Sequence, residues 1–442
     1  MRQLRAILIV IMALCLGAND ALARRRERCR EQVLCHSRDY YKDIFMDGGI
    51  GLTSRTSLPS TLFLSLSMEY FASASEKSLT AKDTIYQREI FCGSEEDTNG
   101  WLLFPDGAPR YRMVYVNGGK AIKHARAMGE LGAERIGSFV SNGGSYLGTC
   151  AGAYIASVGS YKKGSLQPNG HYWGVWPGYV RATGLRKSST DILIGRSSPL
   201  HRYFNFGKGS VVESVRHNGG CSAYESFVAI YPEGTEVLAT YIFDDTQRIQ
   251  IDGKPSVWAY KASPTSGRVI LCGSHPESVK EGKRLEFMSA MVLYAMDGNA
   301  SPTVKGKLQD GQVREMNLRT EDNNPDYTRI GDRQYHHFTF DVPRNCKSVT
   351  VFLEGYKGED DFDLTLCAKR GERAYQDNTP IKQLSKGCTK SLVIDRPKSG
   401  SWYLSVFCQT TVTTTTNRYG TRYKGSTSVL NGVPYKIRIE CQ

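Results

Sequence analysis

Cys150 stands in a sequence pattern that is typical of a reactive thiol. Gly148 and Gly152 flank it as Gly-x-Cys-x-Gly, after a short apolar run and before a helix expected to start at Ala151. A strand, a sharp turn and a helix form a nucleophile elbow, whose small neighbours let a substrate approach the backbone. The positive end of the helix dipole would favour the thiolate. The alternative interpretation is a buried structural cysteine in a glycine-rich loop.

His275 and Glu277 are the second candidate group. They follow residues 268–272, which are predicted to form a strand. An imidazole there can accept the thiol proton, while a nearby carboxylate orients the ring and stabilises its cation. A loop histidine without a catalytic role is the commoner occurrence. Complementary roles nevertheless favour a catalytic triad of Cys150, His275 and Glu277.

The elements that must bring these groups together read as a βαβ series. Residues 113–116 are predicted to form a strand, which ends at Gly118 and Gly119, and apolar residues then recur at helical spacing up to residue 140. Such a series predicts a parallel sheet with both turns at its carboxyl edge, where α/β proteins bind ligands. The amides of Gly118, Gly119 and Ala151 are therefore candidates for an oxyanion hole. A plain glycine turn is the alternative.

Length and composition set broad limits. A chain of 442 residues with 40% apolar residues predicts two domains with real cores. The 57 basic residues exceed the 44 acidic ones and give a net charge of +13. This excess would help association with acidic surfaces or glycans. Because it is spread along the chain, a solvated basic surface is the stronger interpretation, and no nucleic-acid partner is expected.

The amino-terminal residues 1–23 are typical of a secretory signal. A charged start, an apolar core and the small-residue pattern Ala21-Leu22-Ala23 follow one another. No apolar run is long enough to span a bilayer. We therefore expect a secreted, extracellular protein without a membrane span, whose mature chain begins with a basic arm at residues 24–39.

The cysteine count favours disulfides. Twelve cysteines, less Cys15 in the signal and Cys150, leave ten for pairing in an oxidising compartment. Their connectivity is left open by the sequence. No Cys-x-x-Cys pair with zinc-like spacing occurs, so neither a metal site nor another cofactor is expected.

Several motifs occur in a fixed order: Val116-Asn117-Gly118-Gly119, Gly148-Thr149-Cys150-Ala151-Gly152-Ala153-Tyr154, Trp176-Pro177-Gly178, Asn218-Gly219-Gly220 and Gly273-Ser274-His275-Pro276-Glu277. The set resembles the amino-terminal domain of eukaryotic biotin–protein ligases, in the class I glutamine amidotransferase-like superfamily. The resemblance covers about residues 40–295.

The resemblance implies a flavodoxin-like, three-layer parallel sheet and a Cys-His-Glu triad at Cys150, His275 and Glu277. Asn218, Gly219 and Gly220 are carried over as candidate substrate-binding residues. Asn117 stands where the relatives usually show proline, which leaves the oxyanion turn open. No downstream segment resembles the catalytic part of a biotin ligase, so biotin ligation itself is not expected.

The pattern changes to alternating strands from about residue 303, which predicts an antiparallel β-sandwich. Residues 361–366 and 400–406 resemble the bacterial pre-peptidase carboxy-terminal domain, an accessory module of secreted hydrolases. The predicted organisation is an amidotransferase-like domain at 40–297, a linker at 298–319 with a glycosylation acceptor at Asn299, and the sandwich at 320–442.

Two function classes follow. The first is a secreted cysteine hydrolase or amidase that cleaves a small-molecule amide, a peptide or an ester through a thioester on Cys150. The second is a non-catalytic secreted binding protein, in which the scaffold persists without chemistry and the sandwich contacts glycans or cell surfaces. A processed adhesive or structural secretory protein is a weaker third. A sulfur within hydrogen-bond reach of His275 favours the first, whereas Cys150 in a disulfide favours the second.

Overall fold

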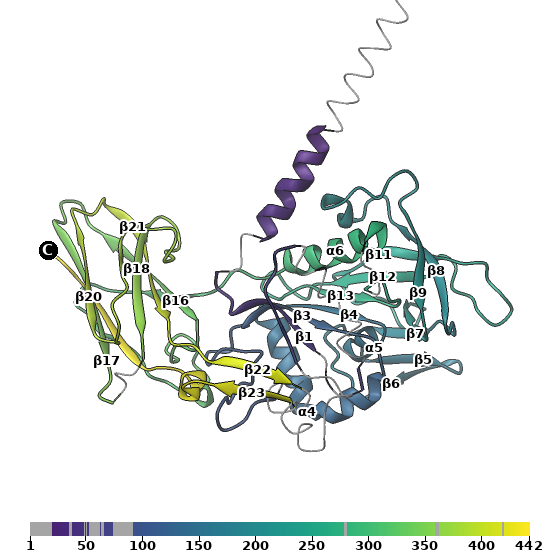
Figure 1. The fold of residues 1–442 in the computed structure, drawn as a ribbon, viewed down its shortest axis with the longest axis horizontal. Helices are drawn as coiled ribbons and strands as arrows, with labels where there is room; N and C mark the ends of the chain where they lie inside the picture. Colours follow the sequence, from purple (N-terminus) through teal and green to yellow (C-terminus); the bar gives the residue numbers. More distant parts are fainter. Residues whose placement is uncertain are drawn as a thin grey trace, which may run out of the picture.

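The computed structural model describes residues 20–34, 38–47, 49, 51–52, 62, 66–73, 92–277, 281–358, 362–417 and 420–442. Residues 1–19 of the expected secretory signal lie outside this part of the chain, so export stays a prediction. Residues 20–34 form a helix that projects from the α/β region (Figure 1). Three of its five arginines are exposed, whereas Arg26 and Arg30 donate to the carbonyl oxygens of His201 and Tyr203. No helix among the described residues is both long and apolar enough to cross a membrane.

A large mixed sheet organises the amino-terminal α/β region, residues 38–300 (Figure 1). Its strand order is β2-β1-β3-β4-β13-β12-β11-β8-β9. The pairings from β2 to β13 are parallel, whereas those from β13 to β9 are antiparallel. The strands are β1 (Lys42–Asp47), β2 (Tyr70–Ala72), β3 (Tyr111–Val116), β4 (Ser145–Thr149), β8 (Ser188–Ile194), β9 (Val211–His217), β11 (Thr235–Ile242), β12 (Pro255–Tyr260) and β13 (Val269–Cys272).

Helices cover both faces of the parallel half. Every residue of β3 and β4 is buried, as expected for inner strands packed on two sides. One face packs against α4 (Ala121–Ser141) and α5 (Ala151–Ala156), and the other packs against α6 (Gly282–Met296) (Figure 1). Successive side chains of β3 point to opposite faces of the sheet. Val114 and Val116 pack in the core that includes α4 and α5, whereas Met113 and Tyr115 pack in the core that includes α6.

These observations correct the predicted sheet. The βαβ series and its parallel pairing are confirmed at β3, α4, β4 and α5, but the sheet as a whole is mixed rather than parallel. A smaller sheet, β10-β7-β5-β6, lies beyond α5. It comprises β5 (Gly159–Lys162), β6 (Ser165–Pro168), β7 (Tyr179–Ala182) and β10 (Cys221–Tyr224). The finer flavodoxin-like assignment stays a prediction.

Two sheets form the carboxy-terminal β region, residues 304–441. One has the order β14-β16-β21-β18-β19 and the other β15-β24-β17-β20, and all their pairings but β14 with β16 are antiparallel. The strands are β14 (Val304–Lys307), β15 (Arg314–Met316), β16 (Tyr335–Val342), β17 (Ser348–Gly355), β18 (Leu364–Arg370), β19 (Lys382–Gln383), β20 (Lys390–Asp395), β21 (Gly400–Cys408) and β24 (Tyr435–Cys441). Membership of the sandwich class stays a prediction.

The segment expected to be a linker is built into this region. Within residues 298–319, β14 pairs with β16 and β15 pairs with β24. Asn299 is not displayed for a glycan either. Its Nδ2 donates to the carbonyl oxygens of Arg112 (2.6 Å) and Gly143 (3.1 Å) and to Ser145 Oγ (3.1 Å). The side chain of Asn299, predicted from the sequence as a glycosylation acceptor, therefore links β3 and β4 by hydrogen bonds.

The disulfide expectation is wrong for the described cysteines, because no disulfide joins them. Several of these thiols are part of the protein interior, since Cys221, Cys272 and Cys367 are wholly buried. A buried thiol behaves there as a small apolar side chain. Cys346 and Cys441 are hydrogen-bonded neighbours without being bonded covalently.

A buried arginine holds the two regions together. Arg110 is completely buried, with its nitrogen atoms 3.8 Å from Asp97 and 3.9 Å from Asp332 of the β region. Its guanidinium lies 4.7 Å from the Trp101 ring, which in turn lies 5.3 Å from the ring of Tyr423. Tyr423 belongs to the hairpin of β22 (Thr413–Asn417) and β23 (Gly420–Lys424), which extends from the β region towards α4 (Figure 1).

Removing this cation should weaken the whole molecule. Arg110→Ala would leave two buried carboxyl groups near each other without their cation, so we expect a loss of about 3–5 kcal/mol in the free energy of unfolding. Urea denaturation followed by circular dichroism measures the loss. Arg186→Ala, at an exposed position, is the control and should change stability by less than about 0.5 kcal/mol. Equal losses in the two variants would contradict the role given to Arg110.

Candidate active site

Cys150 occupies a strained turn between β4 and α5. Its backbone has φ 47° and ψ −99°, in the positive-φ range that residues other than glycine rarely adopt. The turn is held by its own amide, which donates to the Cys272 carbonyl oxygen at 2.8 Å, and by the amides of Ala153 and Tyr154, which both donate to the Cys150 carbonyl oxygen at 3.1 Å. The strand, turn and helix expected around Cys150 are therefore present.

The glycines beside Cys150 are required by close packing. A Cβ atom at Gly152 would come 2.3 Å from the Val116 carbonyl oxygen, and one at Gly148 would come 2.6 Å from the backbone of Gly152. Only glycine fits these two positions without movement of the backbone, so β4 and α5 can lie directly against β3.

His275 and Glu277 reach Cys150 because β13 is the parallel neighbour of β4. Glu277 Oε1 lies 2.8 Å from His275 Nδ1, and the Cys150 side chain is near enough to His275 to contribute to its raised pKa. With Nδ1 directed at the carboxylate, Nε2 is the nitrogen left to face the sulfur. The His275 amide also donates to the Arg216 carbonyl oxygen at 2.8 Å, which fixes the loop. The structure thus brings the three predicted residues together.

The environment of His275 favours its protonated form. Burial by itself would lower its pKa, but hydrogen bonds to Cys150 and Glu277 and the negative charge of Glu277 outweigh burial and raise the pKa to about 10. The His275 side chain is 13% exposed and that of Glu277 only 2%. A shielded ion pair therefore stands beside the sulfur.

The three amides predicted to form an oxyanion hole differ in their surroundings. The Gly118 amide donates to Asn117 Oδ1 at 2.8 Å, so it is not free for a substrate oxygen as expected. Gly119 has φ 149° and packs against Gly51, where a Cβ would come 2.4 Å from the carbonyl oxygen. Ala151 opens α5, so its amide belongs to the first turn, which has no acceptor within the helix. Ala151 is the best-placed of the three donors.

Of the three predicted substrate-binding residues, Asn218 is the one that contacts the sulfur. Cys150 Sγ lies 3.9 Å from the Asn218 carbonyl oxygen. The Gly219 amide donates to the Leu185 carbonyl oxygen at 2.6 Å, and the Gly220 carbonyl oxygen accepts from Tyr154 OH at 3.1 Å. Asn218 thus presents a carbonyl oxygen towards the sulfur, while Gly219 and Gly220 are engaged with the protein.

Sequence reasoning missed a buried polar layer around the triad. Asn117 and Thr149 are completely buried, and Thr149 Oγ1 lies 3.4 Å from both Asn117 Oδ1 and Glu277 Oε1. His217 is also buried, with Nε2 2.6 Å from Thr183 Oγ1. Burial and then the positive charge of His275 lower the pKa of His217 to about 4, which favours a neutral ring at neutral pH. The only signal in the sequence was position. Asn117, Thr149 and His217 each stand at or directly after the end of a strand, within or beside the glycine motifs.

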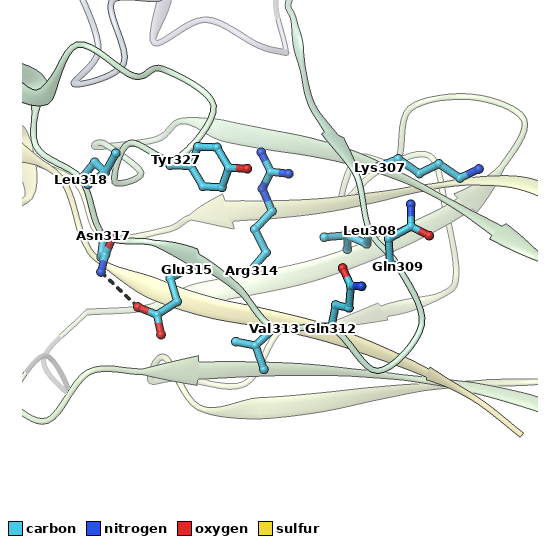
Figure 2. Close-up of a pocket in the computed structure, with 10 residues that line it drawn as sticks. All are labelled: Lys307, Leu308, Gln309, Gln312, Val313, Arg314, Glu315, Asn317, Leu318 and Tyr327. Atoms are coloured by element: carbon cyan, nitrogen blue, oxygen red, sulfur yellow. Dashed lines mark hydrogen bonds between the residues drawn. The ribbon is translucent and has the colours of Figure 1, made fainter.

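A cavity of about 320 Å³ lies elsewhere, in the carboxy-terminal β region (Figure 2). Its charges are largely matched, since Lys307 Nζ lies 2.6 Å from Asp341 and Glu315 lies 3.1 Å from Lys436 Nζ. Arg314 also lines it. No cysteine, serine or histidine is among its ten lining residues. It offers no nucleophile beside a base, so we place the candidate site at Cys150. In the described part of the chain, no three His, Cys, Asp or Glu residues are grouped to hold a metal.

Comparison with known proteins links the α/β region to one family. Residues 108–167 match the model of the family described as "Biotin-protein ligase, N terminal". The biotin–protein ligase of Schizosaccharomyces pombe is 27% identical over 187 residues, covering 38% of this chain and 26% of the yeast protein. The match thus spans about a quarter of that ligase. The likeness is to an enzyme, a ligase by name.

Two solved structures resemble the chain weakly, each at 12% identity and a TM-score of 0.20. One is the pre-peptidase C-terminal domain of a collagenase from Bacillus anthracis, covering 32% of this chain and 99% of that chain. The other is PliG, a periplasmic inhibitor of g-type lysozyme from Aeromonas hydrophila, covering 32% and 98%. At a TM-score of 0.20, neither structure indicates the fold or the function of this chain.

These comparisons correct the function expected from the sequence. A secreted cysteine hydrolase or amidase is contradicted, because the family that matches is one of ligases. The motifs around Cys150 indicated a nucleophile, but a nucleophilic thiol serves bond formation as well as cleavage. Hydrolysis was the wrong choice between the two. The alternative of a secreted binding protein without chemistry has no support either.

The tight turn should not tolerate a side chain at Gly152. We expect Gly152→Ala to cost about 1–3 kcal/mol of unfolding free energy, because the new methyl group must displace the β3 backbone. Gly137→Ala in α4 is the matched control: its Cβ would meet nothing within 4 Å. Its better helix propensity should stabilise the protein by up to about 1 kcal/mol. Urea titration distinguishes the two signs.

Glu277 should control the charge of His275. Glu277→Gln removes the negative charge while burial remains, so the His275 pKa should fall from about 10 to about 6.5 or below. Nitrogen-detected NMR of the imidazole measures this change. Glu213→Gln, at an exposed position of β9, is the control and should leave the titration unchanged. A His275 that still titrates near 10 in Glu277→Gln would contradict the ion pair.

The same pair predicts how stability depends on pH. A folded pKa raised above the unfolded value makes the contribution of His275 complete below about pH 6.5. That contribution is lost as the pH rises towards 10. The difference in unfolding free energy between the wild type and Glu277→Gln should therefore shrink over this interval.

Proposed function

We propose that Cys150 takes up an acyl group as a thioester and passes it to an amine, so that the α/β region performs ligase-type acyl transfer. The observation that carries the proposal is the arrangement of Cys150, His275 and Glu277 on one edge of the sheet, with His275 Nδ1 2.8 Å from Glu277 Oε1 and the same ring interacting with the Cys150 side chain. The likeness to biotin–protein ligase supports bond formation over hydrolysis. That name specifies a small carboxylic acid and a protein, which we adopt as the two reactant classes.

The first step forms the thioester. His275 holds the proton of Cys150, so the sulfur attacks as a thiolate, at the carbonyl carbon of an activated carboxylic acid such as an ester or acyl phosphate. The bond from sulfur to carbon forms as the bond to the leaving group breaks. The proton on His275 passes to the leaving group, and the Ala151 amide stabilises the negative oxygen of the tetrahedral intermediate. Glu277 keeps the imidazole oriented throughout.

The second step transfers the acyl group. The nitrogen of a neutral amine attacks the thioester carbonyl, the carbon–nitrogen bond forms and the carbon–sulfur bond breaks. His275 takes the proton that the amine loses, which restores the starting ion pair. Cys150 is only 5% exposed, so the sulfur has little contact with bulk water. This shielding supports transfer to an amine over loss to hydrolysis.

An acyl-transfer assay tests the proposal. The protein is incubated with the p-nitrophenyl ester of biotin, and intact mass spectrometry follows the adduct before and after addition of Nα-acetyl-lysine amide. We expect a thioester on Cys150 that converts to the amide product. Cys150→Ala should lower amide formation by about 10³-fold or more. Cys367→Ala, a buried thiol of the β region, is the matched control and should keep full activity.

Two outcomes would overturn acyl transfer. The first is an equal yield of adduct and amide in Cys150→Ala, which would place the chemistry elsewhere. The second is conversion of the adduct to the free acid alone at saturating amine. Performing the assay at one pH with one ester concentration keeps the variants comparable.

A further inference from the structure

Asn117 lies at the centre of a buried hydrogen-bond network below the triad. It follows the last residue of β3 and is completely buried. Its Oδ1 accepts from the Gly118 amide at 2.8 Å, and Tyr115 OH and Thr149 Oγ1 lie at 3.2 Å and 3.4 Å. Because donors converge on Oδ1, the orientation of the side-chain amide is determined, and Nδ2 must point away from them.

Two buried atoms of complementary type flank Thr149. Thr149 Oγ1 lies 3.4 Å from Asn117 Oδ1 and 3.4 Å from Glu277 Oε1. The second polar atom of each side chain, Asn117 Nδ2 and Glu277 Oε2, is buried without a hydrogen-bond partner among the described residues. Asn117 Nδ2 is a donor that needs an acceptor, and Glu277 Oε2 is an acceptor that needs a donor.

The atom without a partner on Glu277 belongs to a charged group. A buried carboxylate requires donors to remain charged, and His275 and Thr149 serve only its Oε1 atom. Catalytic hydrogen bonds are often long in an unliganded site and shorten when the substrate complex forms. Asn117 and Glu277 contact the same Thr149 hydroxyl, so Asn117 is a buried amide placed near enough to supply that second donor.

We propose that Asn117 is a positioning residue, whose Nδ2 group donates to Glu277 Oε2 and so holds the carboxylate against His275. Asn117 Oδ1 also influences the position of the His275 ring, through the Gly118 turn. By binding the Gly118 amide it fixes a turn that packs on the imidazole, where a Cβ at Gly118 would come 2.2 Å from His275 Cε1. This inference rests on the proposed function, because it concerns the same thiol, but its tests need no acyl transfer.

The test must account for every titratable group near the pair. Cys150 and His217 face His275, while Tyr115 and Cys272 face Glu277. All of them are retained in the variants below, so changes in the titration of His275 report on Asn117 and Glu277.

A double-mutant cycle between Asn117→Leu and Glu277→Gln separates the two roles of Asn117. The readouts are the pH midpoint of Cys150 alkylation by iodoacetamide and the His275 titration by NMR, on the full chain. If Asn117 acts through Glu277, Asn117→Leu should lower the His275 midpoint by about one unit or more in the wild type. In the Glu277→Gln background it should then cause almost no further change.

Equal shifts in both backgrounds would overturn the inference, because Asn117 would then act only through the Gly118 turn. A folded Asn117→Leu variant without any shift would overturn it as well. Asn99→Leu is the matched control: Asn99 is also buried, but its Nδ2 donates to the Phe104 carbonyl oxygen at 2.7 Å, away from the triad. It should lower stability and leave the His275 midpoint unchanged.

A second variant guards against loss of the fold. If circular dichroism shows that Asn117→Leu does not fold, Asn117→Ser replaces it in the same cycle, because serine is polar yet too short to reach Glu277. The outcome is also independent of the proposed function. Coupling without amide formation would reject acyl transfer alone, and amide formation without coupling would reject the role of Asn117 alone.

Discussion

The site depends on the positive-φ backbone at Cys150, which must be held in place by its surroundings. Such a conformation costs about 1–3 kcal/mol and persists only where packing enforces it. Here the enforcement comes from Gly148 and Gly152, which allow β4 and α5 to press against β3, and from the Cys272 carbonyl oxygen that binds the Cys150 amide. The same contact brings the end of β13, and with it His275, to the sulfur.

Charge in the site is organised in layers. His275 and Glu277 form a shielded ion pair, and a neutral polar layer that includes Asn117 and Thr149 lies beneath it. His217 adds no second cation, since burial and the charge of His275 lower its pKa to about 4. An ion pair surrounded by neutral dipoles keeps its orientation without competing charges, which is the arrangement that a nucleophilic thiol requires.

The sequence was informative wherever local pattern and chemistry agreed. The Gly-x-Cys-x-Gly pattern located the turn at Cys150, the helical spacing after Gly119 located α4 (Ala121–Ser141), and the apolar run before His275 located β13. The parallel pairing of β3 with β4 follows from the βαβ rule, whereas the nearness of His275 to Cys150 was inferred from their complementary chemical roles, before the pairing of β13 with β4 was known.

The remaining features depend on contacts that no local pattern encodes. The antiparallel half of the large sheet pairs β8 with β9 and β11, and its alternation reads like that of any surface sheet. The engagement of the Gly118 amide by Asn117 needs a side-chain conformation that only the fold provides. The choice between cleavage and bond formation is likewise not contained in the triad, because both use the same nucleophile and base.

The junction at Arg110 has a consequence for how the molecule comes apart. Because its cation is shared by Asp97 and Asp332, and because Trp101 packs on a ring from the β22–β23 hairpin, neither region has a complete core by itself. The two halves should therefore melt in a single cooperative transition. In a chain truncated after residue 300, Trp101 would be exposed to water and Arg110 would keep Asp97 but lose Asp332, so this fragment should aggregate rather than fold by itself.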